Sequence, residues 1–213
     1  MSAGKKFPGF SQPATFTVAQ ASAITGVPQA QVNQYIDRDL NKLNLIISGS
    51  GERRVNAEAL VALRLVHDFT DGFAPAFRLE LVRKALLSPS KKSIQLGDGK
   101  VTARVDVIRR NVAAGLKAYK AAVAQVHASD DILGGEPCLK GTRTSVYTLA
   151  GLMAECGATE VKRAYSWVSD AQLAACAVFA KANPLRGRRP KSIGARLEAS
   201  QIKPRRSRTK IIA

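Results

Sequence analysis

The chain has 213 residues, of which 46% are hydrophobic, so it can bury the core of one medium-sized domain or of two small ones. Its formal net charge of +17 is typical of proteins that bind polyanions, most often nucleic acid. No apolar run is long enough for a membrane span, and residues 1–14, a predicted flexible N-terminus, lack the apolar stretch of a secretory signal. Three cysteines without CxxC spacing argue against disulfides and zinc, so we expect a cytoplasmic protein. The lack of a long apolar run predicts no membrane contact.

Residues 15–70 have the pattern of two short helices that are joined by a tight turn and followed by a hairpin. Gly26 ends the first helix and Pro28 opens the second, because glycine suits the end of a helix and proline its first turn. The stretch LNLIISGSGERRV predicts two strands around a glycine-containing turn, and Asn56 can cap the helix that follows. With its FTV and TGV segments, this region resembles the MerR-like and excisionase-like winged helix-turn-helix modules, which implies a DNA-binding domain.

The second helix is polar on the face that such a module turns toward DNA. Asparagine and glutamine can pair with two atoms of an adenine edge, and arginines can bind the flanking phosphates. Asp37 and Asp39 depart from this pattern, since they would lie near phosphates. The alternative interpretation is a solvated helix face beside a basic hairpin. The predicted DNA-binding residues are Gln29, Gln31, Asn33, Gln34, Arg38, Arg53 and Arg54.

Residues 71–127 are predicted to form a connector. We expect a helix over 74–87, a hairpin turned by the Gly-Asp-Gly segment at 97–99, and then a long amphipathic helix. Seven apolar residues recur along that helix at spacings of three and four, from Val105 to Val126. Such a stripe either packs inside its own domain, which is the commoner outcome, or forms the seam of a dimer.

The stretch GGEPCLKGTRT, at 134–144, contains glycines, a lysine and hydroxyls but lacks the order of a phosphate-binding loop. Its lysine precedes the last glycine, and no apolar strand leads into it. We expect Gly134, Gly135 and Gly141 to turn the chain between two short strands. Thr142 and Arg143 are expected to secure the turn by hydrogen bonds, with Arg143 facing a partner as the alternative.

Helices are predicted within the rest of the segment 128–184, over 146–156, 159–164 and 169–183. Gly157 ends the first of them, and Ser169 with Gln172 forms a capping box for the last. Together with the glycine-rich stretch, this succession resembles the small domain of VapB-type antitoxins, which was long catalogued as a domain of unknown function. The resemblance implies a cytosolic antitoxin of a type II toxin–antitoxin system that forms a homodimer, binds operator DNA to repress its own operon, and neutralises a PIN-like ribonuclease toxin. The other interpretation is a stand-alone DNA-binding regulator.

No arrangement of residues in the sequence predicts catalysis. The two histidines lack a nearby cysteine or carboxylate pair, so we expect neither a metal nor another cofactor, and no enzyme. Cys176 lies in an apolar helix and is predicted to be a buried small hydrophobe, whereas Cys138 in the glycine-rich stretch is predicted to be exposed.

Residues 185–213 contain ten basic residues and one acidic residue, which predicts a disordered tail. The antitoxin resemblance suggests that the tail blocks the carboxylate cluster of a nuclease, because arginine pairs with carboxylates through two hydrogen bonds. The alternative is a solvated tail that adds affinity for DNA. The predicted fold class is mainly α with small β pieces. The predicted toxin-binding residues are Arg186, Arg188, Arg189, Arg196 and Leu197.

Overall fold

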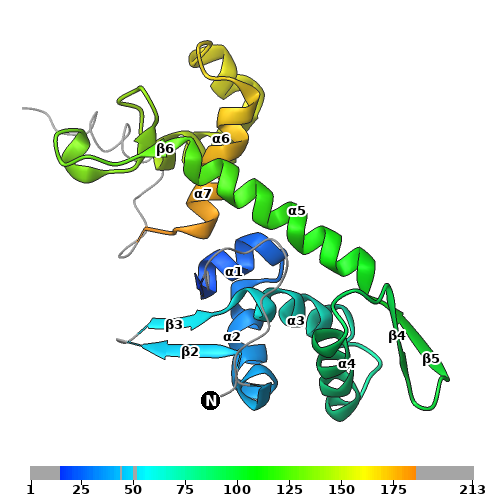
Figure 1. The fold of residues 1–213 in the computed structure, drawn as a ribbon. Coiled ribbons are helices and arrows are strands. Elements are labelled where there is room, and N and C mark those ends of the chain that lie inside the picture. Colours follow the sequence, from blue (N-terminus) through cyan, green and yellow to red (C-terminus); the bar gives the residue numbers. More distant parts are fainter. Residues whose placement is uncertain (1–14, 44, 50–51, 186–213) are drawn as a thin grey trace, which may run out of the picture.

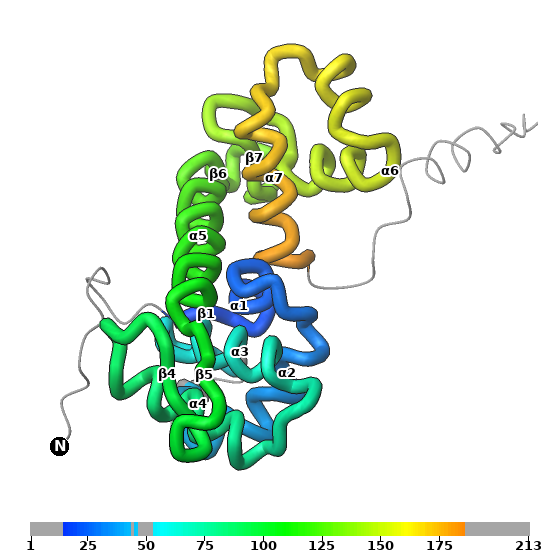
Figure 2. The backbone as a smooth tube through the Cα atoms, turned by 90° about the vertical axis from the view of Figure 1, so that its right-hand side faces the viewer, coloured from blue at the N-terminus to red at the C-terminus, as the bar shows by residue number. Residues whose placement is uncertain are grey.

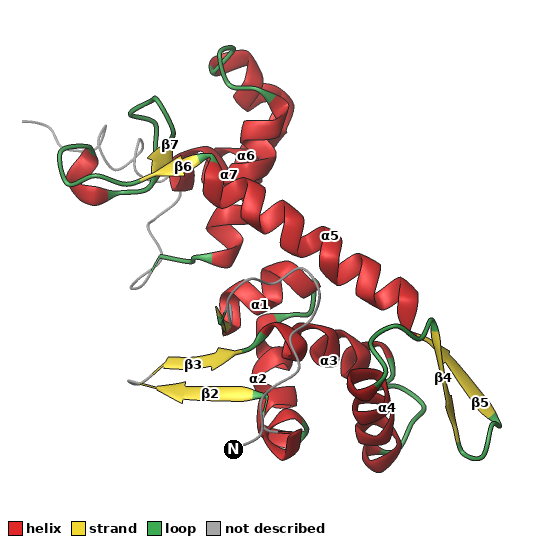
Figure 3. Ribbon diagram, in the orientation of Figure 1, coloured by secondary structure: helices red, strands yellow, loops and turns green. Residues whose placement is uncertain are grey.

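A computed structural model describes residues 15–43, 45–49 and 52–185. As predicted, the fold is mainly α-helical with small antiparallel hairpins (Figures 1 and 3). One long helix, α5 (Val105–Ala124), runs from a group of helices and two hairpins near the N-terminus to a second, smaller group near the C-terminus (Figure 1). We call these groups the N-terminal module, residues 15–104, and the C-terminal module, residues 126–185. No helix in the described ranges is long and apolar enough to cross a membrane.

The N-terminal module begins with the predicted pair of short helices. Thr17 accepts a hydrogen bond from the backbone of Gln20, whose side chain bonds back to Thr17, and this capping box starts the first helix. Gly26, with φ of 75°, ends this helix in a left-handed conformation that other residues rarely adopt. The elements are β1 (Phe16–Thr17), α1 (Val18–Thr25), α2 (Gln29–Arg38) and the 3-10 helix η1 (Leu40–Leu43).

The predicted hairpin follows as β2 (Ile46–Gly49) and β3 (Glu52–Val55), which pair antiparallel with each other. On its other edge, β3 pairs antiparallel with β1. The predicted turn covers residues 49–51, of which Gly49 ends β2 and residues 50–51 lie outside the described residues. Asn56 then caps α3 (Ala57–Asp68) by accepting a 2.8 Å hydrogen bond from the backbone of Ala59, as predicted.

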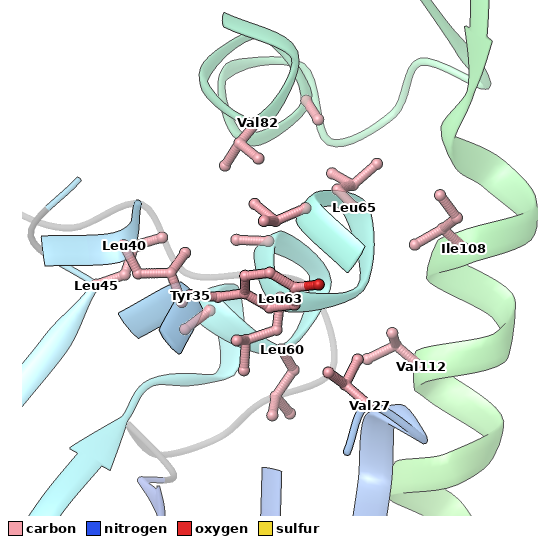
Figure 4. Close-up of a cluster of buried hydrophobic side chains, with 14 of the residues drawn as sticks. Val27, Tyr35, Leu40, Leu45, Leu60, Leu63, Leu65, Val82, Ile108 and Val112 are labelled. Carbon is pink, nitrogen blue, oxygen red and sulfur yellow. The ribbon is translucent and has the colours of Figure 1, made fainter. Parts of the chain in front are cut away.

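A single hydrophobic core holds this module together and continues into α5. Figure 4 shows Leu60, Leu63 and Leu65 of α3 clustered with Val82 of α4 and with Ile108 and Val112 of α5. The buried cluster therefore runs across residue 70, which the sequence had suggested as a domain boundary. The further elements that share it are α4 (Pro75–Leu87), β4 (Ser93–Leu96) and β5 (Val101–Arg104).

The apolar stripe of α5 is used mainly within the chain. Its first four members, from Val105 to Leu116, are buried in the core, whereas Val123 remains 43% exposed and Val126 lies beyond the helix in a strand. The described residues thus confirm, for these four positions, the prediction that the helix packs within its own domain.

Gly115 allows α5 to pass directly over α1. A Cβ atom at residue 115 would lie 2.0 Å from the carbonyl oxygen of Ile24, far inside contact distance. Because the obstructing atom belongs to backbone, no side-chain rotation relieves the clash. The two helices can meet at this separation only with glycine at residue 115.

The C-terminal module closes around a second, smaller core. Gly157, with φ of 85°, interrupts the helical backbone where the sequence predicted a break, and Ser169 and Gln172 form the predicted capping box. The last described helix, α7, turns back to lie against both α5 and α1 (Figure 2). The elements are β6 (Val126–His127), the 3-10 helix η2 (Leu133–Gly135), β7 (Cys138–Leu139), α6 (Val146–Ala164) and α7 (Asp170–Ala182).

The prediction that Cys138 is exposed was wrong, whereas the predicted burial of Cys176 is confirmed. Cys138 pairs with His127 across the small sheet and forms a β-bridge with Ser145, so other segments of the same chain enclose it on both sides. Burial raises the pKa of the Cys138 thiol, helped by the charge of Glu136, and burial raises the pKa of Cys176 to about 11.

We predict that replacing Gly115 by alanine lowers the free energy of unfolding by about 1–3 kcal/mol, because the added methyl group must push α1 away from α5. Urea denaturation measures this change. Gly151→Ala is the matched control: it also lies in a helix, but nothing occupies the space around it, so alanine should stabilise by about 0.5–1 kcal/mol. Equal stability of the two variants would contradict the close approach.

We further predict that one cysteine of the folded protein, the exposed Cys156, reacts rapidly with a disulfide reagent at pH 8. Cys138 and Cys176 should react only after denaturation, because both are buried and their raised pKa values keep them as thiols. Titration with a chromogenic disulfide measures both phases. Cys156→Ser should abolish the fast phase, and a fast phase that survives it would refute the assignment.

Candidate nucleic-acid interface

Helix α2 is anchored by one face and presents polar side chains on the other. Val32, Tyr35 and Ile36 are buried in the core, which holds the helix in a fixed orientation. Gln29 and Asn33 are four residues apart and therefore lie on the same face of the helix, which remains accessible. The helix can thus offer two amide side chains to a ligand without giving up its packing.

The β2–β3 hairpin is tied to this helix through Arg53, whereas Arg54 bonds to the residue that precedes β1. Arg53 forms an ion pair with Asp37, 2.8 Å between Nη1 and Oδ1, with both side chains 52% exposed. Arg54, on the opposite side of the strand, donates a 3.1 Å hydrogen bond to Thr15. An exposed ion pair contributes only about 0–1 kcal/mol, so Asp37 holds Arg53 weakly.

Neither aspartate at the end of α2 presents an unpaired charge on the surface of the protein. Arg53 neutralises Asp37, and Asp39 is buried at the end of the helix with 2% of its surface exposed. The unfavourable charges that the sequence placed beside a phosphate are thus paired or withdrawn.

Four of the seven predicted DNA-binding residues line one groove with a volume of about 640 Å³. They come from two elements, Gln29 and Asn33 from α2 and Arg53 and Arg54 from β3. The other three do not line this groove. Gln31 is half-buried, and its side-chain oxygen is enclosed without a hydrogen-bond partner, whereas Gln34 and Arg38 are exposed elsewhere on the helix surface. The structure therefore brings together a subset of the prediction.

The far wall of the groove belongs to the C-terminal module. It consists of Tyr147 at the start of α6 and of Ala182, Asn183 and Pro184 at the end of α7. These residues could not be predicted from the sequence, because no local pattern connects the end of α7, the last described helix, with a hairpin far earlier in the chain. Their only sequence signal is that Asn183 and Pro184 end a helix.

Asn183 joins this wall to the N-terminal module. Its side-chain oxygen accepts a 3.1 Å hydrogen bond from Nε2 of Gln20, and its backbone carbonyl accepts a 2.6 Å hydrogen bond from the hydroxyl of Tyr147. Burial raises the pKa of Tyr147, with a smaller contribution from Glu136, so the phenol keeps the proton that it donates. The end of α7 is thus held on both sides.

The glycine-rich turn lies away from this groove, in the C-terminal module. Gly134, Gly135 and Gly141 have φ values of 63°, 84° and 78°, which confirms that the glycines serve the backbone. Thr142 secures the turn as predicted, donating 2.9 Å to the carbonyl of Leu139 and accepting 3.1 Å from the backbone of Thr144.

Arg143 does not secure the turn, and that part of the prediction was wrong. Thr142 makes the two side-chain hydrogen bonds of the turn, and the exposed Arg143 makes no hydrogen bond or ion pair with any residue that the structure describes. It lines an open depression of about 420 Å³ together with His127 and Ile132.

One further predicted feature cannot be placed on this surface. The predicted toxin-binding residues, Arg186, Arg188, Arg189, Arg196 and Leu197, lie outside the described residues. Among residues 15–43, 45–49 and 52–185, no group of three or more histidine, cysteine, aspartate or glutamate side chains is arranged to hold a metal ion.

Comparison with known proteins identifies the C-terminal module alone. Residues 126–180 match a family model described as "Protein of unknown function (DUF433)". The uncharacterized protein y4eO of Sinorhizobium fredii (strain NBRC 101917 / NGR234) is 44% identical over 66 residues, which are 30% of this chain and 29% of that protein. This chain therefore spans less than a third of the length of that relative. No solved structure matches the chain. The matched segment begins with β6 and ends within α7, so it coincides with the part that closes around the second core.

Proposed function

We propose that this protein is a DNA-binding antitoxin, which recognises an operator through α2 and the β2–β3 hairpin and neutralises a PIN-like ribonuclease toxin. The observation that carries the DNA-binding half is the groove in which the amides of Gln29 and Asn33 stand beside Arg53 and Arg54. Amide side chains suit the edge of adenine, and arginines suit the phosphates that flank it. The net charge of +17 provides the attraction that brings a polyanion to this surface.

The geometry of the N-terminal module supports docking in the major groove. That groove of B-DNA is about 12 Å wide and admits one helix, and on α2 the amide of Gln29 is exposed and that of Asn33 is partly exposed. The hairpin beside it can reach the adjacent backbone with Arg53. We expect two copies on an operator of two-fold symmetry, since a single short helix reads few base pairs.

The neutralising half rests on different support, namely the likeness of residues 134–172 to antitoxin modules. The segment 128–184 has five basic and six acidic residues and is therefore nearly neutral, which suits contact with a protein better than contact with DNA. The competing proposal is a regulator with no nuclease partner. It would bind DNA through the same groove but would not neutralise a toxin.

We predict that Arg53→Ala combined with Arg54→Ala weakens binding to operator and to unrelated duplexes alike, and lowers the dependence of log K on log salt by roughly one to two units. Fluorescence anisotropy on a labelled duplex from the promoter of this gene measures both effects. Lys117→Ala, an exposed cation on α5 away from the groove, is the control and should leave binding unchanged. Asn33→Ala should instead cost about 1–3 kcal/mol at one base pair only. Unaltered binding by the double arginine variant would refute the proposed interface.

We predict that a PIN-like nuclease is encoded beside the gene for this protein, that this protein rescues cells from that nuclease, and that the two proteins copurify. Induction of the nuclease with and without this protein measures rescue as colony counts. The double arginine variant at residues 53 and 54 is informative here as well, because it should still rescue if DNA binding and neutralisation use different surfaces. Growth arrest that this protein fails to relieve would leave the stand-alone regulator as the better account.

A further inference from the structure

A pocket of about 410 Å³ lies where the end of α4 meets β4. It belongs to the N-terminal module, but the β4–β5 hairpin projects from the opposite side of that module to the β2–β3 hairpin (Figures 1 and 2). A ligand in this pocket would therefore contact the protein away from the groove beside α2. The residues that line this α4–β4 pocket are Lys84, Ser88, Lys91, Ser93, Ile94 and Gln95.

The α4–β4 pocket collects polar side chains that have no partner. Side chains alternate along β4, so Ile94 is buried while Ser93 and Gln95 stand together on the exposed face of the strand. Four of the lining side chains make no hydrogen bond or ion pair with any residue that the structure describes: Ser88, Lys91, Ser93 and Gln95. The pocket thus offers an ammonium group, two hydroxyls and an amide to a ligand.

The carbonyl groups beside the pocket are already occupied. The last turn of a helix leaves carbonyl oxygens unpaired, and these would repel an anion. Arg109 of α5 donates hydrogen bonds to the carbonyls of Ala85, at 2.8 Å, and of Ser88, at 3.1 Å. Its other Nη atom donates to the carbonyl of Lys91. Arg109 therefore compensates the negative end of α4 and holds the loop that carries Ser88 and Lys91.

Carboxylates of the two neighbouring helices are paired as well. Glu80 of α4 forms an ion pair with Lys84, 2.7 Å between Oε1 and Nζ. Asp106 of α5 pairs with Arg104 at 3.3 Å and with Arg110 at 2.9 Å. The segment 80–110 has eight basic and three acidic residues, a net charge of +5, so an excess of positive charge surrounds the pocket after these pairs are formed.

This set of donors suits a phosphate group. Phosphate oxygens in complexes with nucleic acid accept hydrogen bonds from lysine, serine and glutamine side chains, which are the types that line this pocket. A carboxylate pairs best with the planar guanidinium of an arginine, but both Nη atoms of Arg109 are used on carbonyl groups. The exposure of Lys91 and Ser93 leaves room for a continuous chain to pass, and the net charge of +17 favours a polyanion over a small anion.

We propose that the α4–β4 pocket binds one phosphate group of a nucleic-acid backbone. Lys91 neutralises the phosphate, and the hydroxyls of Ser88 and Ser93 donate hydrogen bonds to its oxygens. This contact goes beyond the proposed groove and shares no residue with it. A nucleic acid that reaches both sites bends around the N-terminal module or is present as two segments. Free phosphate is the other source of the same chemistry, and the tests below distinguish the two.

Lys91→Ala combined with Ser93→Ala tests the pocket by fluorescence anisotropy of a labelled duplex of unrelated sequence over a range of salt concentrations. Loss of one phosphate contact should lower the salt dependence of log K by about 0.9 units. Lys100→Ala is the matched control, because it removes the same charge from the tip of the same hairpin but lies outside the pocket. Its effect should be less than about a third of that of the double variant. An unchanged salt dependence in the double variant, or an equal change in the control, overturns the proposal.

Protection of a thiol tests the position directly. Ser93→Cys in a Cys156→Ser background places one reactive thiol in the pocket, because Cys138 and Cys176 are buried. A saturating duplex should slow its reaction with a neutral chromogenic disulfide at least about tenfold, since access governs the reactivity of a thiol. The native Cys156, exposed on α6, is the control and should slow by less than about twofold.

Two outcomes of the protection experiment overturn the proposal. An unprotected thiol at residue 93 would show that nucleic acid does not occupy the pocket. Equal protection by inorganic phosphate, at the concentration of phosphate groups that the duplex supplies, would assign the pocket to a free anion instead of a backbone.

The variants separate this proposal from the proposed function. If the Lys91 and Ser93 variant lowers the salt dependence and the Arg53 and Arg54 variant does not, the pocket stands and the groove fails. If only the arginine variant lowers it, the groove stands and the pocket fails. If both lower it, their effects should add in the combined variant, because the two sites have no residue in common.

Discussion

The contact between Gly115 of α5 and the carbonyl of Ile24 of α1 is the constraint on which the arrangement of the two modules depends. It lets the backbones of two helices meet without an intervening side chain. α7 lies against both of these helices, so three helices from distant parts of the chain contact one another in pairs. Moving α1 away from α5 would shift α2, which follows it after a short turn, relative to the C-terminal module.

The second link in this arrangement is Gln20, whose two side-chain atoms serve two different parts of the structure. Its oxygen accepts a 3.0 Å hydrogen bond from the backbone of Thr17 and so completes the cap of α1. Its nitrogen donates to Asn183 at the end of α7. A typical hydrogen bond contributes only about 0.5–1.5 kcal/mol, so this link orients the modules while the helix packing supplies the stability. The relative position of the two walls of the groove therefore depends on how α1 packs.

Local features of this fold could be predicted from the sequence because each has a local physical cause. Asn56 and Ser169 are followed by backbone donors that their side chains can reach, and Gly26 and Gly157 adopt conformations that other residues avoid.

The groove and its far wall could not be predicted, because their causes join residues that are distant in the sequence. Gly115 resembles an unfavourable residue inside a helix until α1 is placed against it. The burial of Cys138 depends on its pairing with His127, and the wall at Asn183 depends on Gln20, 163 residues away. The prediction for Arg143 was wrong for a related reason, since the sequence does not show that Thr142 makes the side-chain hydrogen bonds of the turn.

The pairing of Arg53 with Asp37 suggests how affinity and selectivity divide in the proposed DNA complex. The pair has no net charge, so the surface next to Gln29 and Asn33 attracts a phosphate backbone weakly before contact. Amides add hydrogen-bonding capacity without charge, and their contribution is realised only on base edges that match them. Long-range attraction must then come mainly from cations elsewhere, and the segment 185–213, with a net charge of +9 from ten basic residues and one acidic residue, carries the largest concentration of them. In such an arrangement the basic segment sets how tightly any duplex is held, and α2 determines which duplex is preferred.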